Sequence, residues 1–322
     1  MEQKSVIVSV CMITYNHENF IREAIEGVLM QKTDFPIELI IGEDCSTDNT
    51  RSIVLEYASK YPEIIRPLLP EKNLGVMKNF IETLLAAIGK YIALCEGDDY
   101  WTDPYKLQKQ VDFLEANEAY SFIHTNGQDL LKNKLKIWSK WKNGIVEGDV
   151  TTEIYYSTIA RTCSVLFRTV YLPEYLIISK NCKSKTIGDW PLFAFYASKG
   201  KFGYLTEPTC VYRHSANSTT RTKNKMHLTQ YYIDSIEIKR FLRDYLFKGK
   251  LYEEFSEEKL IMDTNYLKLK YAFDVFDYNY ALEISKENLL NSKSLKLLKF
   301  TNNKFLFMIG SVYRKAVRLV KF

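Results

Sequence analysis

The sequence predicts an α/β protein in which a mostly parallel, Rossmann-like sheet carries helices on both faces and a helical extension follows at the C-terminus. Apolar strand-like runs alternate with amphipathic helical stretches, β-α-β-α-β-α-β-α-β, over residues 5–124. One run, residues 91–95, is continuously apolar, as in strands buried on both faces of a parallel sheet. The pattern turns helical from about Met226. We therefore predict a sheet domain over residues 1–225 and a helical region over residues 226–322.

The individual elements follow from local patterns. The predicted strands cover residues 5–13, 37–42, 64–69, 91–95 and 120–124. Helix starts are marked by capping residues: Asn16 for the first helix, residues 46–48 for the second, and Pro104 at the first position of the fourth. The third helix, from Met77 to Ile88, has the most regular apolar spacing.

Residues 125–225 are less periodic. A polar, lysine-rich stretch at 129–141 predicts a loop or small hairpin over the carboxyl edge of the sheet. Further on, the sequence predicts a strand at 164–168, a helix at 189–198 and a closing strand at 202–212. The polar run at 213–220 predicts a mobile loop.

Composition excludes several classes of protein. With 46% hydrophobic and 14% aromatic residues among 322, the chain can build a core and is not globally disordered. A net charge of +5 does not imply nucleic acid, and we expect no such partner. Six separated cysteines without a CxxC pair argue against a disulfide framework or zinc site. Without a signal-peptide pattern or an apolar run of about 18 residues, we expect a cytoplasmic location.

The last 37 residues are strongly basic. Nine lysines and arginines face one acid, Glu287, in this segment. Apolar residues from Phe305 to Val320 fall on one helical face and Arg314, Arg318 and Lys321 on another. Two interpretations stay open: a helix docked on the rest of the protein, or a peripheral contact with the anionic inner face of the cytoplasmic membrane.

Carboxylates stand where predicted strands end. Glu96, Asp98 and Asp99 follow the apolar run, at the sheet edge where open α/β folds bind ligands. Clustered acids repel one another unless a cation binds between them, and hard divalent cations prefer oxygen ligands. Taken alone, the cluster is more typical of a solvated acidic turn before the next helix. Neither GxGxxG nor GxxxxGK[ST] occurs, which disfavours dinucleotide and P-loop sites.

Several motifs together resemble a known family. TYNHENFIREAI, EDCSTDNT, EGDDYW with TDPYKLQKQVDFLE, and Gly188-Asp189-Trp190 occur in that order and resemble bacterial family 2 glycosyltransferases over residues 5–225. The resemblance implies the GT-A fold, a nucleotide-sugar donor, a divalent metal such as Mn²⁺ or Mg²⁺, and inversion at the anomeric carbon.

The resemblance also implies site residues. Asp44 would recognise the nucleobase, although helix capping is an alternative for it. Asp99 would hold the metal with Asp98, and Asp189 would be the general base. The donor-binding residues implied in this way are Thr14, Tyr15, Asp44, Lys78, Asp98 and His214, with Arg213 beside the last. Three positions depart from the usual family pattern: Glu43, Cys45 and Glu96.

The predicted function is therefore metal-dependent, inverting sugar transfer in cell-surface polysaccharide synthesis. The donor would be a UDP-sugar, and the acceptor a saccharide or a lipid-linked glycan. A non-catalytic sugar-binding or scaffold protein on the same fold is the alternative, and a sugar nucleotidyltransferase is less favoured. Trp101 and Trp190, each beside a predicted site acid, would either stack on sugars or pack in the core.

Overall fold

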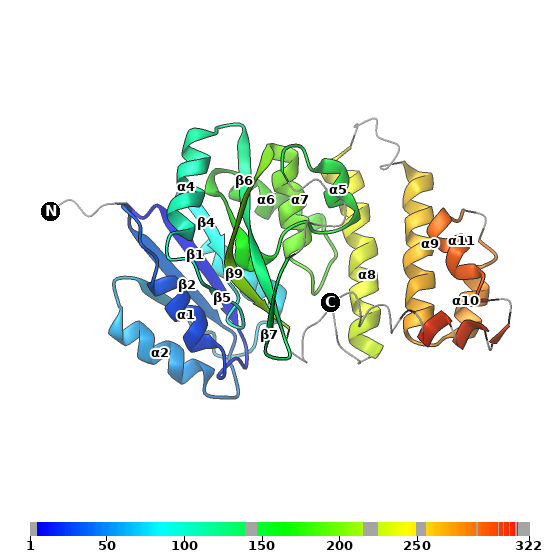
Figure 1. Ribbon diagram of the computed structural model, residues 1–322, viewed down its shortest axis with the longest axis horizontal. Coiled ribbons are helices and arrows are strands. Elements are labelled where there is room, and N and C mark those ends of the chain that lie inside the picture. The colour runs from blue at the N-terminus through cyan, green and yellow to red at the C-terminus, as the bar shows by residue number, and fades with distance from the viewer. Residues whose placement is uncertain are drawn as a thin grey trace. The chain divides into compact units, whose positions relative to one another are not determined.

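The chain forms two compact units, seen in a computed structural model (Figure 1). The structure describes residues 5–138, 147–214, 225–248, 256–287, 289–301, 303–304, 306–308, 310–312 and 314. Unit 1 comprises Met1–Lys180 and Gly188–Ser215, and unit 2 comprises Asn181–Ile187 and Ala216–Phe322. The predicted division at residue 225, as a boundary between independently folding domains, stays a prediction.

Unit 1 is organised around one sheet with the strand order β3-β2-β1-β4-β8-β6-β9-β5, and β7 pairs with β6. The strands are β1 (Val8–Thr14), β2 (Ile37–Glu43), β3 (Ile65–Leu68), β4 (Tyr91–Leu94), β5 (Tyr100–Trp101), β6 (Tyr120–Leu131), β7 (Lys134–Ile137), β8 (Val165–Arg168) and β9 (Lys201–Arg213). Strands β1 to β4 run parallel, and β6 runs parallel to β9. The predicted parallel pairing holds for β1 to β4, and all of β4 is buried as its apolar run predicts. The rest of the sheet is mixed, because β8 is antiparallel to β4 and β6, β5 to β9, and β7 to β6.

Helices cover both faces of this sheet, as predicted. Those of unit 1 are α1 (Ile21–Leu29), α2 (Thr50–Lys60), α3 (Val76–Leu85), α4 (Lys106–Ala116), α5 (Thr151–Tyr156), α6 (Leu172–Ile178) and α7 (Asp189–Lys199). Alternation along β1 explains the two faces: Val8, Val10 and Met12 pack with residues of α1, α2 and α4, whereas Cys11 faces Thr83 of α3.

The structure also departs from the local predictions. Strand β8 lies antiparallel between β4 and β6. The sequence does not predict this position, because the pairing of distant strands is not encoded in local periodicity. The fourth helix begins at Lys106 rather than at Pro104, and Asp103 Oδ1 accepts a hydrogen bond from the Tyr105 amide in the turn before it. Asn16 is not a helix cap, since α1 begins five residues later and Asn16 adopts a left-handed φ of 55°.

Unit 2 is helical. Its helices are α8 (Lys225–Phe241), α9 (Glu257–Asp274), α10 (Tyr278–Ile284) and α11 (Ser292–Leu298), with a π-helical turn η4 (Leu242–Leu246) after α8. Helix α9 packs against α8, α10 and α11, and α8 and α9 lie side by side as the long yellow and orange helices of Figure 1. Ser256, Asp277 and Asn291 cap α9, α10 and α11 through side-chain oxygens.

The described part of the basic tail is docked on unit 2. Phe307 is buried in a core with Phe273 of α9, and Arg314 Nη2 lies 3.0 Å from Asp274 Oδ1. Met308 and Val312, four residues apart, are 52% and 58% exposed. The part of the predicted amphipathic segment beyond Arg314, with Arg318 and Lys321, lies outside the described residues. None of the helices in the described parts of the chain is long and apolar enough to span a membrane.

Candidate active site

The candidate site lies at the carboxyl ends of β1, β2 and β4. These three strands are parallel neighbours, so the loops that follow them meet at one edge of the sheet. The two N-terminal loops are tied together: Asn16 Oδ1 accepts from the Thr47 amide at 2.8 Å, and the Asn16 amide donates to Ser46 Oγ at 2.9 Å. The acidic residues 96–99 follow directly after β4 and Cys95.

The acids after β4 form a cluster of negative charge. Burial, together with the charges of Asp98 and Asp189, raises the pKa of Glu96 to about 8, although its carboxylate accepts a hydrogen bond from the Thr162 hydroxyl. Burial and the charges of Asp98 and Glu96 raise the pKa of Asp99 well above its usual range. Shifts in this direction arise when carboxylates are buried and lie close to other negative charges. The cluster is therefore not an ordinary solvated turn.

Asp99 has one carboxylate oxygen bound and one free. Its Oδ1 accepts a 2.7 Å hydrogen bond from the Arg213 amide. The residue is only 2% exposed, and its buried Oδ2 has no hydrogen-bond partner among the described residues. Asp98 beside it is half-buried and faces partly toward solvent. An unpartnered carboxylate oxygen next to further acids suits a hard divalent cation.

The described residues contain no preformed group of three His, Cys, Asp or Glu side chains able to hold a metal. This agrees with metals that take one or two carboxylates from the protein and complete their coordination with phosphate oxygens. Asp98 and Asp99 fit that type of site better than a closed metal cage.

Arg213, at the end of β9, fixes the acidic loop. Its Nε donates to the Asp98 carbonyl at 2.8 Å, and its Nη2 pairs with Glu23 at 2.6 Å. The guanidinium also lies 4.8 Å from the ring centre of Phe20 and 5.0 Å from that of Tyr100. The side chain therefore holds the loop backbone in place, a role that no motif in the sequence predicts.

The structure brings Asp189 into the neighbourhood of the acidic cluster. Asp189 is the first residue of α7, and its charge contributes to the raised pKa of Glu96, 93 positions earlier in the chain. Burial raises the pKa of Asp189 itself, and the positive charge of Arg161 opposes that effect. A half-buried carboxylate with a raised pKa can accept a proton from a bound hydroxyl group.

Both tryptophans beside the predicted acids belong to the core. Trp101 is 2% exposed and donates from Nε1 to the Cys163 carbonyl at 2.8 Å. Trp190 is 6% exposed and donates from Nε1 to the Ile154 carbonyl. Of the two interpretations that the sequence left open, core packing is the one the structure supports.

On the side of the first two strands, Asp44 is a buried carboxylate with backbone partners. Its two oxygens accept from the amides of Leu74 at 2.6 Å and Gly75 at 3.0 Å, just before α3 begins. Both amides precede the first residue of α3, and the N-cap residues of α2 and α3 are Asn49 and Gly75, so Asp44 orders a turn rather than capping a helix. Base recognition by Asp44 stays a prediction. Cys45, which follows it, has φ +57°, in the left-handed region that glycine adopts without strain.

The other predicted donor-binding residues differ in accessibility. Thr14 is buried, with Oγ1 3.2 Å from His17 Nδ1, whereas Tyr15 is 43% exposed and open to a ligand. Lys78 is exposed on α3. His214 lies close to Asp129, with 2.7 Å between Nε2 and Oδ1, and only 4% of its side chain is exposed.

Sequence reasoning missed Arg161, which lies in the irregular segment between α5 and η1 (Thr162–Ser164). Its guanidinium lies 4.4 Å from the ring centre of Tyr212 and 6.0 Å from that of Trp138, and Nη2 is 3.5 Å from Asp129 Oδ1. Its Nε is buried without a partner among the residues that the structure describes. No local periodicity or motif marks this residue.

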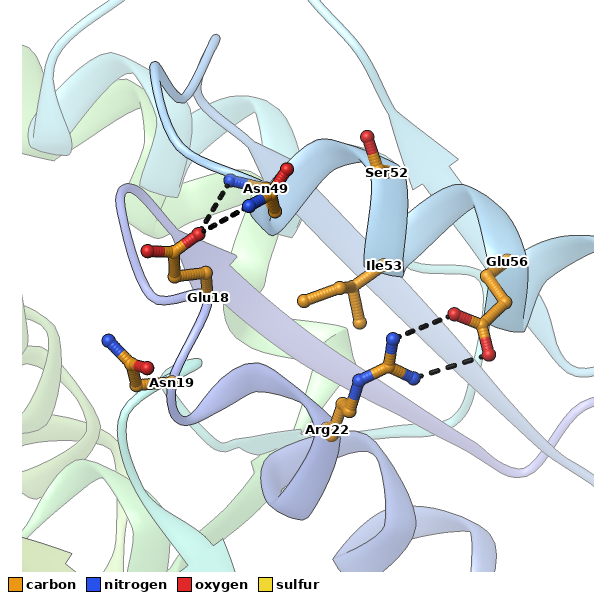
Figure 2. A pocket seen from close by; sticks show the side chains of 7 residues that line it. All are labelled: Glu18, Asn19, Arg22, Asn49, Ser52, Ile53 and Glu56. Carbon is orange, nitrogen blue, oxygen red and sulfur yellow. Dashed lines mark hydrogen bonds and ion pairs between the residues drawn. The ribbon is translucent and has the colours of Figure 1, made fainter.

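A surface pocket lies apart from the acidic cluster, between the start of α1 and α2 (Figure 2). Polar side chains in it pair with each other: Arg22 forms an ion pair with Glu56 at 2.8 Å, and Asn49 Nδ2 donates to Glu18 at 2.8 Å. The lining residues are Glu18, Asn19, Arg22, Asn49, Ser52, Ile53 and Glu56. None of the predicted site residues is among them.

Comparison with known proteins places this geometry in a family. Residues 9–172, half of the chain, match the family described as Glycosyl transferase family 2. The chain belongs to glycosyl transferase family 2. It is 39% identical over 215 residues to an uncharacterised Mycobacterium tuberculosis protein, a match over 65% of this chain and 59% of the relative. The chain therefore spans less than two thirds of that relative's length.

Two further relatives carry transferase names. An uncharacterised glycosyltransferase of Haemophilus influenzae is 26% identical over 321 residues, covering 87% of this chain and 96% of the relative. The dTDP-rhamnosyl transferase RfbG of Shigella flexneri is 27% identical over 220 residues, covering 64% of this chain and 72% of the relative. Family membership thus has support from relatives matched over most of their length.

Solved structures establish the fold as GT-A-type. Residues 1–349 of Staphylococcus aureus TarS in complex with UDP-GlcNAc match with a TM-score of 0.57 at 17% identity, covering 97% of this chain and 92% of that chain. The Pyrobaculum calidifontis mannosyltransferase PcManGT, in complex with GDP-Man and Mn²⁺, matches with a TM-score of 0.52 at 15% identity, covering 97% and 87%. The predicted fold is confirmed.

Proposed function

We propose that this protein transfers a sugar from a nucleoside diphosphate donor to a saccharide or lipid-linked acceptor, with a divalent metal and with inversion. The observation that carries the proposal is the convergence of Asp189 on the acidic cluster that follows β4. Direct displacement at an anomeric carbon needs a base for the acceptor hydroxyl and charge stabilisation for the departing diphosphate. In this chain two separate groups of carboxylates are available for these tasks.

Asp98 and Asp99 would hold the metal, which when bound would neutralise charge on the departing diphosphate. The unpartnered Oδ2 of Asp99 supports this assignment, and so does the half-exposed carboxylate of Asp98 next to it. Arg213 would keep both residues in position through its contacts with the loop backbone and with Asp99.

Asp189 would act on the acceptor. Its carboxylate takes the proton of the acceptor hydroxyl while the hydroxyl oxygen forms a bond to the anomeric carbon. The bond from that carbon to the diphosphate breaks at the same time, and its electron pair leaves with the diphosphate. A pKa raised by burial makes Asp189 a stronger base than a solvated aspartate.

Thr14, Tyr15 and Asp44 would line the nucleoside pocket. The exposed ring of Tyr15 supports stacking of a base, while Asp44 orders the turn at Leu74 and Gly75 and could accept from a base imide with a remaining lone pair. UDP is the proposed nucleotide. The bound UDP-GlcNAc of TarS favours it, whereas the names of RfbG and PcManGT refer to dTDP and GDP.

Peripheral contact with an anionic membrane is part of the proposal, because a lipid-linked acceptor would lie at such a surface. The exposed Met308 and Val312, with Lys304 on the same helical stripe, support it. The pairing of Arg314 with Asp274 shows that part of the tail's positive charge is used within unit 2.

The test is a hydrolysis assay with UDP-, dTDP- and GDP-sugars, in Mn²⁺ and in EDTA, that measures the nucleoside diphosphate released. A transferase should release slowly, with one base preferred, and release should stop in EDTA. Binding of a nucleotide sugar without any release, in the presence of candidate acceptors as well, would instead identify a non-catalytic sugar-binding protein.

A further inference from the structure

The departing diphosphate requires positive charge beyond a metal, yet the cations expected from the sequence have other partners or lie elsewhere. Arg213 is bound to Glu23 and to the Asp98 carbonyl. His214 is buried against Asp129. Lys78 is exposed on α3, where a lysine is ordinarily solvated. A further cationic side chain among the described residues would therefore be needed to bind the phosphoryl oxygens.

Arg161 is held in place by three contacts but keeps much of its hydrogen-bonding capacity. Its guanidinium carbon lies 4.4 Å from the Tyr212 ring centre, and its ion pair with Asp129 is long at 3.5 Å. Its Nε is buried without a partner among the described residues, while 30% of the side chain is exposed. A guanidinium has five N–H donors in a rigid plane that matches phosphate oxygens.

The chain around Arg161 joins it to the acidic cluster. The next residue, Thr162, donates its hydroxyl hydrogen bond to Glu96. Tyr212, on which Arg161 is stacked, immediately precedes Arg213, whose amide binds Asp99. The negative charges of Asp99, Glu96 and Asp98 and the positive charge of Arg161 all act on the Tyr212 hydroxyl. Arg161 is therefore a cation within a site that is otherwise dominated by carboxylates.

We propose that Arg161 binds phosphoryl oxygens of the donor's diphosphate and stabilises the charge that develops there as the sugar departs. This inference rests on the proposed function. The stacked ring of Tyr212 and the Asp129 carboxylate would orient the guanidinium before the donor arrives, so little side-chain freedom is lost on binding. A purely structural Arg161 would only offset the charges of Asp129 and Asp189.

Calorimetric titration of the full chain with UDP and with UMP, in Mn²⁺ and in EDTA, tests the proposal. Arg161→Gln should weaken UDP binding by about tenfold or more, as expected for a lost charge-assisted hydrogen bond, and leave UMP binding within about twofold. Arg161→Lys keeps the positive charge but loses the planar guanidinium, so its UDP affinity should lie between those of the wild type and Arg161→Gln. Arg22→Gln is the matched control, because Arg22 pairs with Glu56 on the surface.

The other outcomes are distinct. Equal losses for UDP and UMP together with a lower Tm would mean a structural role, and unchanged UDP affinity would overturn the proposal. If Arg161→Gln abolished binding of inorganic phosphate to the UDP-saturated protein but left UDP affinity intact, the phosphoryl group would belong to the acceptor, and the donor assignment would be wrong. A wild-type chain that binds no nucleotide would instead contradict the proposed function itself.

Discussion

The amide of Arg213 donates a 2.7 Å hydrogen bond to Oδ1 of Asp99, which joins two residues 114 positions apart. This bond connects the end of β9 to the turn after β4 and fixes the carboxylate with Oδ2 buried and without a partner in the part of the chain that the structure describes. An acid held in this way, next to Asp98 and Glu96, is costly without a cation.

Asp99→Asn should remove the metal-dependent part of donor binding. The amide keeps an acceptor for the Arg213 N–H but loses the negative charge that would attract Mn²⁺. We expect the gain in UDP affinity from Mn²⁺, measured by titration against an EDTA sample, to fall by at least about tenfold. Asp98→Asn should have the same effect if both carboxylates hold the metal.

Glu115→Gln is the control for this experiment, since Glu115 pairs with Lys90 at the exposed surface of the same unit. Should Mn²⁺ raise UDP affinity as strongly in Asp99→Asn as in the wild type, Asp99 would not be a metal ligand. Asp98 would then be the residue to test alone.

Asp189→Asn should greatly slow sugar transfer and leave donor binding nearly unchanged. Replacing a general base costs about 10²- to 10⁴-fold in rate. Single-turnover release of nucleoside diphosphate should therefore fall by that factor while UDP affinity stays within about twofold. Because burial raises the pKa of Asp189, the acid limb of the wild-type rate profile should lie above the usual aspartate range, and it should disappear in the variant. A variant with normal turnover would exclude Asp189 as the base.

Much of this site could be predicted from local sequence. The continuous burial of β4 follows from its apolar run, and parallel strands bring residues 96–99 to the ligand-binding edge. The start of α7 at Asp189 also coincides with the start of the predicted helix at residue 189. In each case the determining information lies within about ten residues of the feature, where periodicity and turn chemistry act.

The partners of these residues could not be predicted, because they come from distant segments. Arg161 reaches the site only because β8 inserts antiparallel between β4 and β6, a pairing that no local pattern encodes. Asp129 meets His214 only after β6 and β9 have paired over nine positions. Likewise, the hydrogen bonds from the Leu74 and Gly75 amides to Asp44 join segments 30 and 31 positions apart.

Tyr15 and Trp101 should respond in opposite ways to substitution. Tyr15→Ala removes an exposed ring and should lower UDP affinity by about fivefold or more, as for a lost base stack, with little change in Tm. Trp101→Phe leaves the Cys163 carbonyl without its donor and should cost about 1–3 kcal/mol of unfolding free energy, with donor affinity retained. Denaturant unfolding and UDP titration of both variants would separate the effects. A stable Trp101→Phe variant with weakened donor binding would contradict the core assignment.

The stability of the metal-free protein should fall as pH rises. The pKa of Glu96 is raised from its ordinary value of 4.5 to about 8, so between these values the folded state holds a proton that the unfolded state has lost. The stabilisation is fully present below pH 4.5 and disappears as pH passes 8. In EDTA, Tm should therefore decrease from pH 6 to pH 9.

Glu96→Gln should reduce this pH slope, because a glutamine carbonyl can still accept from the Thr162 hydroxyl and carries no charge. The remaining slope would come from Asp99, whose pKa is also raised. Added Mn²⁺ should stabilise the wild type more at pH 9 than at pH 6, since a cation favours ionised carboxylates. An identical slope in wild type and variant would show that Glu96 is already ionised at neutral pH.

Gly97→Ala should disturb the acidic loop by collision with Thr14. A Cβ at position 97 would lie 2.5 Å from Thr14 Oγ1 and 2.8 Å from Thr14 Cβ, closer than side chains approach. Overpacking of this kind costs about 1–3 kcal/mol, and displacement of the loop should also weaken Mn²⁺-dependent UDP binding. Thr14→Ala removes the nearer atom, so the double variant should recover part of the loss in a double-mutant cycle. Purely additive losses in unfolding free energy would mean that position 97 is limited by its backbone rather than by Thr14.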